Sequence, residues 1–192
     1  MKKYAAFDVL EVEVAHGGNR ALRRAMAHAG MPVGTHQQFC RVAHRAEFAY
    51  DRKPGMIYVR SRAISSRCND NWDEFPAPEI KQAYRTFVGK PVFVNHHNEN
   101  HRRARGVIID AALHEDVNPD GSPDTWVEVL MEVDALQFPK LAEAILKGHI
   151  DRTSMGTDVA YSICSACGNG ASTPLDYCQH IPKMKGQMHY RH

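Results

Sequence analysis

The chain has 192 residues, of which 43% are hydrophobic and 24% charged, and its formal net charge is +2. This size and composition are typical of one globular domain, and the near balance of acids and bases indicates neither a nucleic-acid nor a membrane partner. No run of about 18 apolar residues occurs, and the first residues are too polar for a signal-peptide core, so the sequence predicts a cytoplasmic protein.

The first part of the chain predicts one short helix and one strand. Residues 19–28 combine a capping residue with good helix formers and are followed by Gly30, a pattern typical of a short basic helix. Residues 56–64 suit a strand, and the polar residues 65–73 suit a loop.

An amphipathic helix and two strands are expected next. Pro76 precedes an apolar stripe with helical spacing, and Gly89 ends it; the stripe consists of Ile80, Ala83, Tyr84 and Phe87. Residues 91–94 predict a buried strand, and residues 106–113 predict another. The polar segment between these two strands contains a pair of histidines.

The rest of the domain predicts a hairpin, a helix and a last strand. A turn at residues 118–123 leads into residues 126–133, where valines and methionine alternate onto one face. Residues 138–145 predict a second amphipathic helix that ends at Gly148, and a strand is expected at residues 159–163. The predicted fold class is α+β, built mainly on an antiparallel sheet with flanking helices.

The segment Asn95–His96–His97–Asn98 is a candidate for general-base chemistry. A histidine at the exposed end of a hydrophobic strand is held by the sheet, and its near-neutral pKa lets it take and return a proton. Taken alone, the pair is more typical of two polar histidines in a surface loop.

A candidate nucleophile lies in the segment 151–157. Ser154 is followed by Met155 and Gly156, and the glycine permits a tight backbone whose N–H groups could face a developing oxyanion. Ser-x-Gly also occurs in ordinary turns, so this segment alone predicts a turn serine at least as well.

Three of the five cysteines lie close together near the C-terminus. Cys164 and Cys167 form a Cys-x-x-Cys turn, and Cys178 with His180 completes a Cys3His set. This spacing predicts a closed, tetrahedral and therefore structural zinc site. The alternative is a set of unrelated cysteines; the remaining two, Cys40 and Cys68, are expected to be free thiols.

The order of these segments resembles the tailed-bacteriophage prohead proteases, whose fold is shared with the herpesvirus assemblins. The resemblance covers residues 56–186: a strand that ends in Asn-His, a strand that begins Gly-Val-Ile, a helix that ends in glycine, and Thr-Ser-Met-Gly. Residues 71–76, residues 103–108 and the Cys-x-x-Cys…Cys-x-His insertion are similar to the large-phage branch of the family.

The resemblance implies an assemblin-like fold and a serine endopeptidase with no catalytic cofactor. Ser154 would be the nucleophile and His96 or His97 the base, with the N–H groups of Met155 and Gly156 as oxyanion donors. Expected substrates are the phage major capsid protein, the scaffold or core proteins, and the enzyme itself. The expected location is the infected bacterial cytoplasm, inside the prohead, as a homodimer or higher oligomer.

The third catalytic residue is left open by the sequence. His180 has a separation from the serine comparable with that of the second assemblin histidine, but it is also the fourth zinc ligand. Asp176 and Asp158 are the alternatives, because phage enzymes of this kind use an acid.

The expected domain organisation has three parts. Residues 1–50 form an N-terminal segment of unclear role, residues 51–163 the protease core, and residues 164–192 the zinc-binding loop with the start of a C-terminal part. The chain stops without a closing amphipathic element or a polar tail, which suggests truncation.

Two other functions compete with proteolysis. His97 to His101 superficially resembles a His-Asn-His nuclease, but the cysteines lie far downstream of it instead of around it. A zinc-stabilised scaffold or nucleic-acid-binding module could use Arg102, Arg103 and Arg105 against phosphates. Those arginines also suit a solvated loop.

Overall fold

The structure is a computed structural model, and it describes residues 2–14, 36–38, 46–95 and 100–186. The helix predicted at residues 19–28 and the thiol of Cys40 lie outside these ranges. Within them the chain is α+β with a mostly antiparallel sheet and a few short helices, as the sequence predicts. None of the helices in the described ranges is long and apolar enough to cross a membrane.

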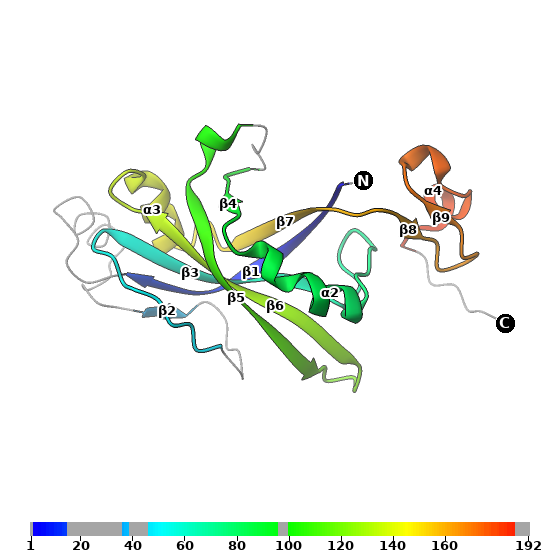
Figure 1. Cartoon of the computed structure of the whole chain (residues 1–192), viewed down its shortest axis with the longest axis horizontal. Helices are drawn as coiled ribbons and strands as arrows, with labels where there is room; N and C mark the ends of the chain where they lie inside the picture. The colour runs from blue at the N-terminus through cyan, green and yellow to red at the C-terminus, as the bar shows by residue number, and fades with distance from the viewer. Residues whose placement is uncertain (1, 15–35, 39–45, 96–99, 187–192) are drawn as a thin grey trace.

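The main sheet of the described residues has seven strands (Figure 1). Six run in the order β2-β1-β3-β6-β5-β4, the seventh, β7, pairs with β1, and every pairing is antiparallel. The strands are β1 (Lys2–Val14), β2 (His36–Gln38), β3 (Met56–Ser65), β4 (Pro91–Val92), β5 (Gly106–Val117), β6 (Pro123–Asp134) and β7 (Arg152–Asp158).

Short helices and a small C-terminal unit complete the described fold. The predicted amphipathic helix consists of α2 (Ala77–Ala83) and the 3-10 turn η1 (Tyr84–Phe87), and the predicted second helix is α3 (Pro139–Leu146). A further 3-10 turn, η2 (His101–Arg103), precedes β5. The C-terminal unit contains β8 (Ser162–Ile163), β9 (Gly170–Ala171), η3 (Pro174–Asp176) and α4 (His180–Met184).

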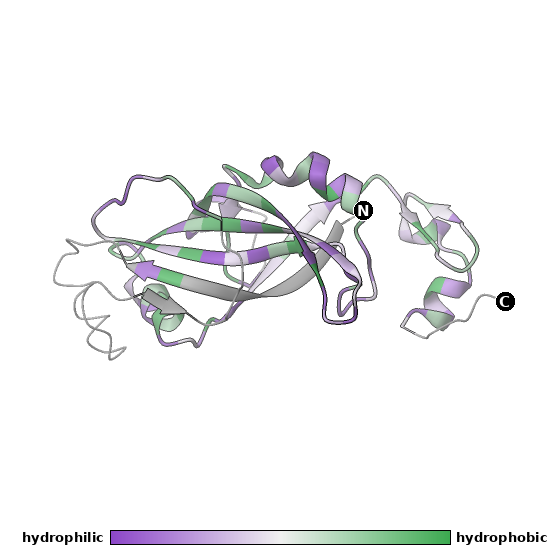
Figure 2. Cartoon of the chain, turned by 90° about the horizontal axis from the view of Figure 1, so that it is seen from below, coloured by the Kyte–Doolittle hydropathy of each residue, from purple (hydrophilic) through white to green (hydrophobic). Residues whose placement is uncertain are grey.

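Strand β6 lies at the centre of the sheet, and both of its faces are buried. Val127, Val129 and Met131 face a core that includes Ile80 of α2 and Ile145 of α3. Because side chains alternate along a strand, the intervening residues of β6 face the other side of the sheet. Green and purple residues accordingly alternate along the long strands in Figure 2.

The face of β6 opposite the helices contains a buried charged network. Glu128 is fully buried; its carboxylate accepts hydrogen bonds from Arg60 Nε at 2.6 Å and from the Ala46 N–H at 3.1 Å, and it lies 2.8 Å from His114 Nε2. Burial by itself would raise the pKa of Glu128, but hydrogen bonds from His114, Arg60 and Ala46 outweigh it and lower the pKa below its ordinary value. The network fastens the chain at residue 46 to the sheet.

Strand β1 pairs with β2, β3 and β7, and its change of partner from β3 to β7 sets the position of β7. Val9 pairs with Ser61 of β3, whereas its neighbour Asp8 pairs with Arg152 of β7. The sheet therefore divides at this point: β3 continues along β6 while β7 continues along β1. Residues 2–14 thus belong to the same sheet as the strands of the expected protease core.

The segment 151–163 differs from its predicted structure. We expected a turn around Ser154 and a strand at residues 159–163, but β7 covers residues 152–158 and a short strand, β8, begins only at Ser162. The reason is pairing with β1, a strand about 150 residues earlier in the sequence that local patterns do not indicate.

Candidate functional site

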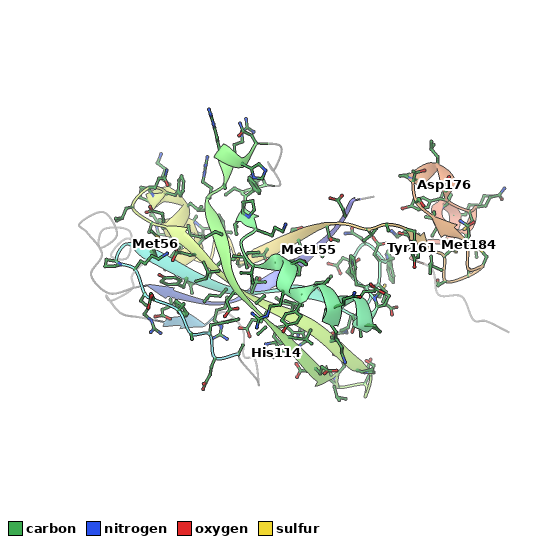
Figure 3. The ribbon with its side chains drawn as sticks, viewed as in Figure 1. Met56, His114, Met155, Tyr161, Asp176 and Met184 are labelled. Atoms are coloured by element: carbon green, nitrogen blue, oxygen red, sulfur yellow. The ribbon has the colours of Figure 1, made fainter. Side chains whose placement is uncertain are left out.

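Ser154 lies in the middle of β7 with its side chain exposed. Its neighbour Met155 is buried in the main core (labelled in Figure 3), so alternation directs the Ser154 hydroxyl away from that core and towards solvent. A strand residue flanked by anchored neighbours has a fixed position, and an accessible hydroxyl in a fixed position is what a nucleophile requires.

The other neighbour of the serine is anchored as well. Thr153 Oγ1 is hydrogen-bonded to Oγ of the fully buried Ser61, and the carbonyl oxygen of Arg62 lies within reach of both hydroxyls, 3.1 Å from Ser61 and 3.4 Å from Thr153. This contact joins β3 and β7 where they separate. It holds the strand that carries Ser154 from the side of the core.

The backbone donors expected around the serine are only partly supported by the strand geometry. Met155 pairs with Ala5 and Gly156 with Tyr4. Consecutive N–H groups of a strand point to opposite edges, so the N–H groups of Met155 and Gly156 cannot both face one oxyanion while β7 is regular. An oxyanion beside Ser154 could therefore accept a hydrogen bond from only one of these two N–H groups, and its other donors would have to come from other segments.

The predicted bases, His96 and His97, lie outside the described residues, but the backbone that leads to them is described. Asn95 has φ of +54°, in the left-handed region that few residues other than glycine adopt, although asparagine tolerates it better than most. The chain therefore turns sharply at the residue before His96. Strained backbone of this kind clusters at functional sites.

Glycine at position 106 allows β5, the strand that follows the histidines, to pack closely on β6. Val92 of β4 pairs with Gly106, and a Cβ on Gly106 would lie 2.5 Å from the carbonyl oxygen of Glu132. The Arg105 N–H also donates to Val92 O at 2.8 Å. Gly106 thus permits a close approach of β5 to β6, and the backbone pairing with Val92 holds the end of β4 against β5.

The serine strand and the end of β4 line one large open concavity. Its wall includes Phe93 and Asn95 from the segment after β4 and Ser154 from β7, although β4 and β7 lie at opposite ends of the strand order. Both ends of the sheet thus border the same concavity. The concavity continues past Tyr161 to the C-terminal unit.

The three candidates for a third catalytic residue lie in different places. Asp158 is on the same strand as Ser154, but four strand residues span about 13 Å, whereas a serine and an acid that share one imidazole are roughly 6–8 Å apart. The Asp176 carboxylate caps η3, where it accepts from the N–H and the hydroxyl of Thr173, each at 3.0 Å. His180 lies in the cysteine cluster described next.

The predicted cysteine cluster is assembled in the C-terminal unit. One potential ligand atom from each of Cys164, Cys167, Cys178 and His180 lies within 4.8 Å of all the others. A tetrahedral zinc ion requires ligand atoms about 3.5–3.8 Å apart, so only a small contraction is needed. These four residues could hold a metal ion.

Two further observations fit a metal at this place. His180 Nδ1 is buried without a hydrogen-bond partner, an arrangement that a bound ion would relieve. The N–H groups of Cys167 and, more weakly, Ala166 face the Cys164 thiol and lower its pKa, which favours the thiolate form that binds metals.

A small hairpin sets the first cysteine pair. Strand β8 pairs with β9, the Cys164 N–H donates to Asn169 O at 2.9 Å, and the Gly168 N–H donates to Cys164 O at 2.8 Å. Gly168 has φ of +74°, which suits glycine. The Asn169 side chain then donates to Asp176 O at 3.0 Å and connects the hairpin with the segment that brings Cys178.

Two features of the structure, one in the main sheet and one in the loop before α2, are not predicted by the sequence. The first is the Glu128 network, whose three side chains come from three strands and whose only local signal is a glutamate among the apolar residues of 126–133. The second is Trp72, which has φ of +57° and lines the concavity, although the loop predicted at residues 65–73 gave it no role.

Comparisons with protein-family models, with curated proteins and with solved structures find no match for this chain. The resemblance to prohead proteases therefore rests on the sequence motifs alone.

Proposed function

We propose that the chain is a serine endopeptidase of the prohead-protease type, which cleaves phage capsid and scaffold proteins and itself. The observation that carries the proposal is the exposed hydroxyl of Ser154, on a strand anchored at both neighbours and in the same concavity as the chain that leads into His96 and His97. An assemblin-like barrel belongs to the proposal, and the position of β7 and of the segment after β4 around one concavity supports it.

The proposed reaction is hydrolysis by acyl transfer. Ser154 Oγ attacks the peptide carbonyl carbon while His96 or His97 takes the hydroxyl proton, and the same histidine returns that proton to the departing amine. Water, deprotonated by the histidine, then attacks the acyl-serine ester; the bond between the acyl carbon and Ser154 Oγ breaks, the histidine returns the proton to Oγ, and the new carboxyl end is released. A serine–histidine pair without an orienting acid would retain part of its activity, since the third group mainly fixes the tautomer and orientation of the imidazole.

We also propose that the Cys3His cluster holds a structural zinc ion. Four protein ligands close the coordination sphere and leave no position for water or substrate, so the ion would stabilise the C-terminal unit. The orphaned Nδ1 of His180 supports this assignment.

Co-expression with the capsid and scaffold proteins of the same phage tests the protease. Mass spectrometry of the products should show processing with the wild type and with the control Ser162→Ala, and none with Ser154→Ala. Equal processing by the Ser154→Ala protein would contradict the nucleophile assignment.

A further inference from the structure

Trp72 has an unusual backbone conformation in the loop between β3 and α2. Its φ of +57° is a real outlier for a bulky aromatic residue, because the Cβ atom crowds the backbone there. Glycine or asparagine would adopt this conformation at lower cost. The surrounding contacts must therefore hold the residue in place.

Asn69 supplies most of these contacts. Its side-chain oxygen accepts from the N–H groups of Asn71 at 2.9 Å and Asp73 at 3.1 Å, and its own N–H donates to Asp73 O at 2.9 Å. The Trp72 N–H donates to Asn69 O at 2.8 Å. The loop is a closed set of hydrogen bonds with the tryptophan at its tip.

The C-terminal unit supports the same loop from the other side. Lys185 Nζ lies 3.1 Å from the Asp73 carboxylate, and a Cβ at Gly186 would be only 2.7 Å from Trp72 Nε1, so the glycine backbone packs directly against the edge of the indole. Two parts of the chain more than 100 residues apart thus fix the position of one side chain.

These contacts do not bury the indole. Trp72 remains 58% exposed and lines the same concavity as Ser154, with Tyr161, 60% exposed, on the chain between β7 and the C-terminal unit. Single exposed apolar residues are common, but few combine exposure with strained backbone and rigid support from two sides. A rigid, exposed aromatic surface binds apolar groups at little entropic cost.

We infer that Trp72 is a substrate-binding residue, which packs against an apolar side chain of the extended polypeptide at a distance from the scissile bond. This inference rests on the proposed endopeptidase function, because it takes the ligand of the concavity to be a polypeptide. The C-terminal unit then contributes to selection of the substrate by holding Trp72 in place.

The test uses the full metal-loaded chain and a pool of random synthetic decapeptides that contain neither tryptophan nor cysteine. The variant is Trp72→Gly, because glycine accepts the backbone conformation, and the control is Leu175→Ala, an exposed apolar residue outside the concavity. We expect Trp72→Gly to raise the apparent KM for cleavage about tenfold and to change the maximal rate less than twofold. The wild type should favour peptides with an apolar side chain at one position, and the variant should lose this preference. The thermal midpoint should stay within a few degrees. Unchanged KM and unchanged preference would overturn the inference.

A second measurement does not depend on catalysis. Trp126 is fully buried, so acrylamide quenching of fluorescence reports on Trp72. In the Ser154→Ala protein the peptide pool should reduce this quenching by at least half, and absence of protection would overturn the inference. If the wild type cleaves no peptide, or Ser154→Ala cleaves as well as the wild type, the proposed function fails while the quenching result still decides the role of Trp72.

Discussion

Ser61 and Thr153 are hydrogen-bonded through their hydroxyl groups at the point where β3 and β7 separate. Ser61 is fully buried, and Thr153 is the residue directly before the candidate nucleophile. The position of Ser154 therefore depends on a polar contact between two strands that are not hydrogen-bonded partners along their lengths.

Thr153→Val should test this dependence. Loss of the hydroxyl weakens the hydrogen bonding of a buried group, so we expect the free energy of unfolding to fall by about 1–2 kcal/mol. Any Ser154-dependent peptidase activity should fall more than stability at assay temperature explains, because the strand loses an anchor. Thr153→Ser is the matched control and should preserve both, as measured by urea denaturation and peptide cleavage. Equal activity of the valine and serine proteins would show that the contact does not position Ser154.

The buried carboxylate of Glu128 should make stability depend on pH. Its pKa in the folded protein lies below the ordinary value of 4.5, so its contribution to stability is present above about pH 4.5 and is lost as the pH falls through the folded pKa. Glu128→Gln should cost about 3–5 kcal/mol at pH 7, because the Arg60 guanidinium loses a buried carboxylate. The difference from the wild type should narrow as the pH falls below about 4.5 in urea titrations.

Glu132→Gln is the control for that experiment. Glu132 lies on the same strand and pairs with Lys53, whose side chain is 58% exposed. An ion pair in contact with solvent contributes little, so the loss should be below about 1 kcal/mol at pH 7. Similar losses for the two variants would mean that burial of Glu128 has no special consequence.

Gly106→Ala should disturb the approach to the histidines. The added methyl group would meet the Glu132 carbonyl oxygen and a methyl group of Val133, and β5 or β6 would have to move. We expect a loss of about 1–3 kcal/mol together with reduced peptidase activity. Gly170→Ala, where a Cβ meets no atom within 4 Å, should change stability by less than about 0.5 kcal/mol. Circular dichroism melts and the cleavage assay would measure both variants.

Metal removal should affect the C-terminal unit before the main sheet. The wild type and Cys68→Ser should each contain about one equivalent of zinc by elemental analysis, and Cys178→Ser close to none. No cluster residue is part of the main core, so the sheet should stay folded while residues 162–184 lose protection from hydrogen exchange. Full zinc content in the Cys178→Ser protein would remove the four-ligand site.

Local patterns in the sequence were sufficient wherever neighbouring residues decide the structure. The hairpin of β5 and β6 was predicted from a turn and an alternating strand, and α3 from an apolar stripe that ends at Gly148. The cysteine cluster was predicted correctly as a group that could hold a metal, because its ligands lie within seventeen residues and turn chemistry alone brings them close. These features depend on interactions of short range.

Contacts between distant segments decided the rest. The sequence by itself determined the α+β class, the Cys3His group that could hold a metal and the identity of Ser154 as a candidate. Only the tertiary structure placed Ser154 on a strand paired with β1, assembled the Glu128 network and held Trp72 at a positive φ. The physical reason is that strand pairing, burial of a charge and backbone strain are each stabilised by partners far away in the chain, which no local pattern of residues contains.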